Sequence, residues 1–246
     1  MRVLIACEFS GTVRDAFNAL GHDATSCDLL PTERPGQHYC GDVRDILGEQ
    51  WDLLIAHPPC TYLSSSGLHW NKRGVTVDGR PRAELTEDAI EFARLFIEGA
   101  THIPFRAVEN PIGCLSTRIR EPEQILQPWQ YGEDASKATC LWLHGLPPLR
   151  PTNFHAPRLV VQNDKWVMRW ANQTDGGQNR LGPSDDRWAE RSKTYQGIAN
   201  AMAMQWSAHI EMARSTVAPA DSTTGKEQST QPMQSGLLFA MAGCAE

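Results

Sequence analysis

An apolar segment that ends in two consecutive prolines places the strongest constraint on how this chain folds. Residues 51–56 are mostly large and apolar, and a His-Pro-Pro-Cys sequence that ends at Cys60 follows them directly. Proline lacks an amide proton, has a fixed φ angle and drives the preceding residue towards extended conformations. We therefore expect a buried strand with a rigid end that carries a thiol. If the strand is parallel to its neighbours, this end lies at the carboxyl edge of the sheet, where open α/β sheets bind their ligands.

Other segments alternate between the patterns of strands and helices. Strands are expected at residues 3–6, 23–27, 105–108 and 139–143, and helical spacing occurs at 13–20, 86–99 and 194–213. This alternation predicts an α/β, Rossmann-like fold, with a mostly parallel sheet and helices on both faces. Glycines and four cations at residues 64–82 predict a long loop.

The composition predicts one domain and a tail. We expect a single α/β domain over residues 1–214, in which residues 122–190, rich in proline and tryptophan, form a small irregular insertion. Residues 215–246 are rich in Ser, Thr, Gln and Pro, which predicts a disordered tail. No apolar run approaches the roughly 20 residues that cross a bilayer, and we expect no signal peptide and no contact with a membrane.

Charge and cysteine content narrow the class of protein. Seven cysteines without a C-x-x-C pair fit reduced thiols, so a cytoplasmic location is expected. The net charge is −6, with a pI of about 5.8. Proteins dedicated to duplex DNA carry a basic excess, because phosphate contacts dominate their affinity. Any contact with nucleic acid must therefore come from local basic patches, or the substrate is smaller than a duplex.

Two polar motifs follow the first two predicted strands. Phe9, Ser10 and Gly11 stand between a strand and a helix, where small residues let the backbone approach a ligand and the helix start offers amides. Asp28 ends the second strand, where a carboxylate can bind ribose hydroxyls. The full G-x-G-x-x-G pattern is absent, so an ordinary strand-to-helix turn is the alternative interpretation.

Two further strands deliver a thiol and a carboxylate to the same sheet edge. A buried structural role describes Cys7 and Cys27, which lie in or beside predicted strands, better than it describes Cys60. We expect no metal site, because His57 and Cys60 lack a second ligand pair at standard spacing. Glu109 follows an apolar strand and can act as a general acid if burial raises its pKa. A solvated loop acid is the alternative for Glu109.

The order of these motifs resembles that of the cytosine-C5 methyltransferases, which use S-adenosyl-L-methionine. Phe9-Ser10-Gly11 is similar to the cofactor turn of that family, and Asp28 to its ribose-binding acid. Residues 41–43 resemble the next cofactor motif, whose acid, here Asp42, reads the adenine amine. Residues 52–60 resemble the nucleophile motif, residues 108–110 the motif whose Glu contacts cytosine, and residues 195–201 the closing motif.

The resemblance implies a role for each matched residue. Cys60 would be the nucleophile that attacks C6, and Glu109 would hold N3 and the exocyclic amine of cytosine. The expected cofactor contacts are Phe9, Ser10, Gly11, Asp28, Asp42, Pro58, Asn200 and Ala201. The expected substrate contacts are Pro59, Asn110, Lys72, Arg73 and Arg180. We also expect Asn110 to orient Pro59 or the neighbouring backbone.

The family chemistry explains these residue types. A thiolate that attacks C6, with protonation at N3, converts the ring into an enamine-like species that accepts a methyl group at C5. A base then removes the C5 proton, and the thiolate leaves. The reaction therefore needs a covalent nucleophile with a paired carboxylic acid.

The chain departs from the family pattern in its second half. It has no Gln-x-Arg-x-Arg motif, and the nearest basic candidates are Lys137, within residues 136–139, Arg180, Arg187 and Arg191. The stretch from 143 to 191 is short for a separate DNA-reading domain, and Trp166, Trp170, Asn172 and Arg180 would form a reduced recognition surface. The pattern is typical of a compact, phage-type member of the family.

Three functions remain open from the sequence. The first is methylation of cytosine in DNA, with the base flipped into the cleft. The second is modification of a free cytosine nucleotide or transfer of a related group. The third is a catalytically silent nucleoside-binding protein, which would have no need for both Cys60 and Glu109.

Overall fold

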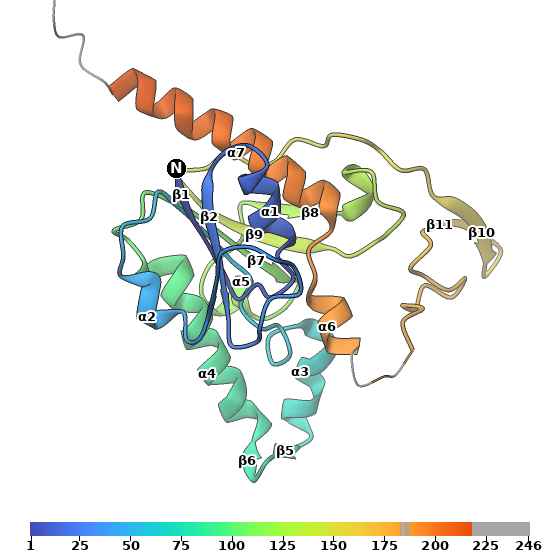
Figure 1. Cartoon of the computed structure of the whole chain (residues 1–246). Helices are drawn as coiled ribbons and strands as arrows, with labels where there is room; N and C mark the ends of the chain where they lie inside the picture. Colours follow the sequence, from blue (N-terminus) through green and yellow to red (C-terminus); the bar gives the residue numbers. More distant parts are fainter. Residues whose placement is uncertain (183, 185–186, 218–246) are drawn as a thin grey trace, which may run out of the picture.

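A twisted seven-stranded sheet forms the centre of the computed structural model, which describes residues 1–182, 184 and 187–217 (Figure 1). The strand order is β3-β2-β1-β4-β7-β9-β8. The strands are β1 (Arg2–Ala6), β2 (Asp23–Asp28), β3 (His38–Cys40), β4 (Leu53–Ala56), β7 (Phe105–Pro111), β8 (Gln124–Leu126) and β9 (Thr139–His144). The first five strands of this order, which are β3, β2, β1, β4 and β7, are parallel. Strand β9 runs antiparallel to both β7 and β8. The expected mostly parallel, Rossmann-like sheet is confirmed.

Helices cover both faces of the sheet. They are α1 (Thr12–Asn18), α2 (Arg44–Leu47), α3 (Ser65–Lys72), α4 (Arg82–Arg94), the π-helical turn η1 (Leu95–Gly99), α5 (Leu115–Arg118), the 3-10 turn η2 (Pro128–Gln130), α6 (Arg187–Ser192) and α7 (Gln196–Val217). Alternate residues of a strand point to opposite faces. Accordingly, Val3 and Ile5 pack with α1 and α7, whereas Leu4 and Ala6 pack with α2, α4 and η1. Figure 1 shows α7 crossing next to α1.

The register of the parallel strands aligns the ends that carry polar side chains. Ala6 of β1 pairs with Ala56 of β4, and Ala56 pairs with Val108 of β7. The next residues along the three strands, Cys7, His57 and Glu109, therefore emerge side by side at the carboxyl edge. Cys7 has φ = 58°, a left-handed conformation that is costly for a residue with a Cβ. Such strain clusters at functional sites, and here it lies at the edge expected to bind ligands.

The structure differs from the predicted elements in three places. The predicted loop at residues 64–82 contains α3 and a small hairpin of β5 (Thr76–Val77) and β6 (Arg80–Pro81). Its helix has no buried residue, so the apolar spacing that reveals a helix was missing. The insertion region contains a second hairpin, β10 (Arg158–Gln162) and β11 (Lys165–Arg169). Finally, α7 continues to Val217, beyond the expected start of the tail, and residues 218–246 lie outside the described residues.

None of the helices described in residues 1–182, 184 and 187–217 is both long and apolar enough to cross a bilayer.

Candidate active site

The His-Pro-Pro-Cys segment after β4 is fixed by an amide from the neighbouring strand. Asn110 of β7 is 1% exposed, and its Nδ2 donates a hydrogen bond to the carbonyl oxygen of Pro58 at 2.7 Å. A buried carbonyl without a donor is costly, so this bond holds the segment against β7. Asn110 thus contacts the backbone next to Pro59, where the sequence led us to expect it.

A histidine meets the glutamate at the adjacent strand end. Nδ1 of His57 lies 3.2 Å from Oε2 of Glu109, and the two side chains are 6% and 11% exposed. Burial raises the pKa of Glu109, but the hydrogen bond from His57 and the positive charge of Lys137 outweigh burial, so the pKa is lowered overall. From the sequence we expected Glu109 to act as a general acid if burial raised its pKa, and this condition is not met. Glu109 is a carboxylate in the free protein.

The candidate nucleophile has the opposite shift. Burial raises the pKa of the Cys60 thiol above its ordinary value of 9.0, and the charge of Glu109 raises it further. Lys137 and Arg191 act in the other direction, because a nearby positive charge stabilises the thiolate. Cys60 is therefore a thiol near neutral pH, and its activation requires a group that takes its proton.

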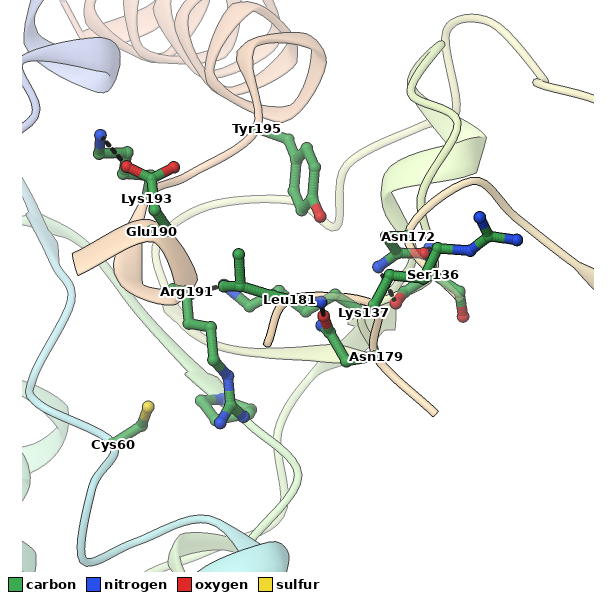
Figure 2. Close-up of a pocket in the computed structure, with 12 residues that line it drawn as sticks. Cys60, Ser136, Lys137, Asn172, Asn179, Leu181, Glu190, Arg191, Lys193 and Tyr195 are labelled. Atoms are coloured by element: carbon green, nitrogen blue, oxygen red, sulfur yellow. Dashed lines mark hydrogen bonds and ion pairs between the residues drawn. The ribbon is translucent and has the colours of Figure 1, made fainter. Parts of the chain in front are cut away.

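Cys60 and Glu109 line one cavity at the sheet edge. This central cavity, of about 170 Å³, is lined by Cys60, Glu109, His57, Asn110, Lys137 and Arg191, among others. A larger outer cavity of about 450 Å³ adjoins it and shares Cys60, Lys137 and Arg191. In Figure 2, the Arg191 side chain extends from α6 towards the side of the outer cavity where Cys60 lies. The structure thus brings the nucleophile, the carboxylate and two cations together.

A third hollow adjoins the central cavity on its other side. This acidic pocket, of about 260 Å³, is lined by Asp28, Asp42, Val43, Pro59, Phe92 and their neighbours. Cys7, Asp28 and Pro59 line both hollows. Burial raises the pKa of Asp28, partly offset by backbone amides, and Oδ1 of Asp42 accepts a hydrogen bond from the amide of Arg44 at 2.9 Å. Two carboxylates beside apolar walls suit a nucleoside, with hydroxyl and amine donors at its polar ends.

The turn before α1 is filled by the protein itself. Glu8 accepts hydrogen bonds from the amides of Val13 and Arg14, at 2.6 and 3.2 Å, so these amides at the helix start are not free. Gly11 has φ = 72°, and a Cβ there would lie 2.5 Å from the Arg14 guanidinium. The glycine therefore accommodates Arg14, which corrects our expectation that it makes room for a ligand.

Phe9 lines the central cavity, whereas Ser10 lines only a small hollow of about 10 Å³ beside it. Pro58 is buried and lines the central cavity, and the exposed Pro59 stands between that cavity and the acidic pocket. Arg180 lines the outer cavity. These expected contacts therefore lie along one continuous cleft.

Four expected contacts are placed elsewhere. Asn200 is exposed on α7, where it accepts a hydrogen bond from Gln196, and Ala201 is buried in the core beneath α7. Lys72 and Arg73 are exposed at the end of α3, and Arg73 stacks on Trp70. None of the four lines the three hollows described above. Gly197 of the same motif has a packing role, because a Cβ there would lie 1.9 Å from the carbonyl oxygen of Tyr131.

The residues expected to form a recognition surface do not all lie together. Asn172 lines the outer cavity, and Trp166 is 72% exposed on β11. Trp170 is buried and stacks on Trp129, with 5.3 Å between ring centroids, so it is a packing residue.

Sequence reasoning missed the role of His57 in the central cavity. It treated His57 only as a failed metal ligand, although the pairing with Glu109 follows from their matching positions after β4 and β7. Among the residues that the structure describes, no three His, Cys, Asp or Glu side chains are placed to hold a metal ion together.

Comparisons with known proteins yield little. No protein-family model and no curated protein matches the chain. Among solved structures, a mutant of DNMT2 from Spodoptera frugiperda is similar over 67% of this chain, with 15% identity and a TM-score of 0.36. The similar region spans 60% of the length of that protein. A likeness at this level carries no argument about the family or the activity of this chain.

Proposed function

We propose that this protein is an S-adenosyl-L-methionine-dependent methyltransferase that modifies C5 of cytosine in DNA through a covalent adduct with Cys60. One observation carries the proposal. Cys60 and Glu109, delivered by adjacent strands, line the same cavity, and a pocket with two carboxylates adjoins it. The proposal is supported by the motif order, which resembles that of the cytosine-C5 methyltransferases, and by Asp28, Cys60 and Glu109, which line the central cavity together.

The acidic pocket fits the nucleoside part of the cofactor. Asp28 is positioned to accept hydrogen bonds from ribose hydroxyls, and Asp42 from an adenine amine, with Val43 and Phe92 against the ring. When bound, S-adenosyl-L-methionine supplies an electrophilic methyl group. Pro59 borders both the pocket and the central cavity, so the two binding regions meet beside Cys60.

The chain's own residues would activate the cytosine ring. Sγ of Cys60 forms a bond to C6 while N3 gains a proton, which makes C5 nucleophilic. Glu109, fixed by His57, accepts a hydrogen bond from the exocyclic amine and presents its other oxygen to N3. The partly buried Cys60 is out of reach of a base stacked in a duplex, so the base must be flipped out of the helix.

The cations of the outer cavity suit the phosphates of a nucleotide. Lys137, Arg180 and Arg191 line it, with Lys193 and a single acid, Glu190. Lys193 is already paired with Glu190 and Glu33, so the first three are the candidates for phosphate contacts. A local basic cluster would allow a chain with a net charge of −6 to bind a polyanion.

Methyl transfer from labelled cofactor, measured in parallel on DNA, RNA and dCMP, tests the proposal. We expect transfer to DNA that Cys60→Ala abolishes. Transfer to dCMP alone would establish the free-nucleotide alternative. No transfer to any of the three by cofactor-bound protein would refute the enzyme and favour a silent nucleoside-binding protein.

DNA that contains 5-fluorocytosine tests the covalent step. Fluorine replaces the C5 proton that must leave, so the adduct with Cys60 is expected to persist through denaturing electrophoresis. Active protein that forms no such adduct would rule out attack at C6. Cys40→Ala, at an exposed thiol that is absent from the lining of the central cavity, is the matched control.

A further inference from the structure

One ring nitrogen of His57 has a hydrogen-bond partner, and the other has none among the described residues. Glu109 is a carboxylate, which can only accept hydrogen bonds, so the proton between the two residues lies on Nδ1 of His57. Nε2 is buried and has no hydrogen-bond partner among the described residues. In the neutral imidazole with its proton on Nδ1, Nε2 carries a lone pair. This nitrogen is available to take up a proton.

The proposed reaction leaves one proton to be moved. Cys60 is a thiol near neutral pH and must lose its proton before it attacks. N3 of the cytosine must gain a proton as the ring becomes an enamine. His57 and Glu109 line the cavity that also holds Cys60, so a group that can store the proton is already present.

We propose that His57 stores the proton that Cys60 loses and returns it, through Glu109, to N3 of the cytosine. This inference rests on the proposed function. In the activated state Cys60 is a thiolate, His57 is an imidazolium and Glu109 remains a carboxylate. His57 thus exchanges protons with both Cys60 and Glu109.

The step balances in atoms and charge. The Sγ–C6 bond forms, the C5=C6 pair becomes C4=C5, and the C4=N3 pair takes a proton at N3 from Glu109. Before this transfer, Oε2 of Glu109 takes the Nδ1 proton of His57, and the carboxylic acid so formed is the group that protonates N3. Glu109 therefore ends as a carboxylate, and His57 ends as a neutral imidazole with its proton on Nε2. Elimination of the thiolate reverses these transfers.

Several other charged or titratable groups surround the pair. They are Cys7 and Glu8 after β1, Asp28 on β2, Cys60 after β4, Lys137 before β9, Cys140 on β9, and Arg191 and Lys193 on and after α6. Burial raises the pKa of Cys7, and burial with the charge of Glu109 raises that of Cys140. None of these side-chain types ordinarily changes charge between pH 5 and 8, whereas imidazole does. A variant that replaces only the imidazole therefore isolates the contribution of His57.

His57→Asn separates proton storage from hydrogen bonding. The Asn amide nitrogen takes the place of Nδ1 and still donates to Glu109, but it cannot titrate. We measure the rate of adduct formation with 5-fluorocytosine DNA between about pH 5 and pH 9, together with cofactor affinity. His144→Asn is the matched control, because His144 is exposed and pairs with Arg106 at the far end of β7.

We expect the His57→Asn variant to bind cofactor like the wild type and to form the adduct about 100-fold more slowly near neutral pH. The pH profiles of the wild type and the variant should differ, because only the wild type has an imidazole that can hold the proton. A variant with the wild-type rate and profile would overturn the inference and leave the proposed function intact. A wild-type protein that forms no adduct would overturn both.

His57→Ala with added imidazole is the second variant, should the asparagine variant fail to fold. A rate that rises with imidazole concentration would support proton storage by His57. The absence of any rise in a protein that still binds cofactor would overturn it.

Discussion

Removal of the Asn110 side chain should damage both the stability and the activity of the protein. Nδ2 of Asn110 is the donor for the Pro58 carbonyl, at 2.7 Å, and the prolines themselves supply no amide that could replace it. In Asn110→Ala the carbonyl stays in a buried region without its partner. The His-Pro-Pro-Cys segment then keeps the contact of His57 with Glu109 but loses the hydrogen bond at Pro58, so the sulfur of Cys60 is held less firmly.

The size of the effect follows from burial. Loss of a partner for a buried polar group costs about 1–3 kcal/mol of the free energy of unfolding. For a domain of this size, 2 kcal/mol corresponds to a fall of roughly 4–8 °C in the melting temperature. Displacement of a reacting atom by about 1 Å can cost up to 100-fold in rate. We therefore expect adduct formation to slow by about 10- to 100-fold.

Urea unfolding and adduct formation with 5-fluorocytosine DNA measure the two effects. The midpoint of urea unfolding should fall in Asn110→Ala with an unchanged slope, because the unfolded state is the same. Gln196→Ala, at an exposed position on α7, is the control and should lie within about 0.5 kcal/mol of the wild type. If Asn110→Ala matches this control in stability, or forms adduct at the wild-type rate, the role assigned to Asn110 is wrong.

Three further perturbations test other parts of the structure. Alkylation of Cys60 by iodoacetamide, followed by mass spectrometry of its peptide, should have a midpoint above pH 9.0 that moves down in Glu109→Gln, since a negative charge that raises the thiol pKa is removed. A midpoint that does not move would show that the charge of Glu109 does not act on the Cys60 thiol. Lys137→Met and Arg191→Met should each weaken DNA binding and reduce the slope of log K against log salt by about 1, and an unchanged slope would exclude phosphate contacts. Gly197→Ala should lower stability by about 1–3 kcal/mol in thermal unfolding, because its Cβ would lie 1.9 Å from a backbone oxygen; an unchanged melting temperature would contradict that contact.

Local patterns predicted most of the sheet. The apolar runs before His57 and Glu109 became β4 and β7, because strands buried on both faces need continuous apolar residues. The segment before Asp28 became β2, although only Ala24 and Cys27 in it are apolar. Parallel strands share a carboxyl edge, so the meeting of Cys60 and Glu109 in one cavity followed from the order of the motifs. Another signal was present and not used: Asn163-Asp164, two residues that tolerate positive φ, stand between two short apolar runs, as in the turn of a β-hairpin.

Local patterns failed where the position of a residue depends on packing against segments that are distant in the sequence. The 195–201 motif suggested cofactor contacts, but α7 buries Ala201 against the sheet and exposes Asn200. The turn at Gly11 suggested free amides, but Glu8 occupies them. In both cases the motif contains the residue types, and the surrounding structure decides which of them reach the cleft.

The sequence by itself determined the strands, their rigid ends and the presence of a thiol and a carboxylate at one edge. Its periodicity and its prolines act over a few residues, and parallel pairing extends their effect across the sheet. Only the tertiary structure decided the ionisation at that edge. His57 lowers the pKa of Glu109, while burial raises that of Cys60 and Lys137 and Arg191 oppose the rise. These shifts depend on distances between residues far apart in the chain, which no local pattern contains.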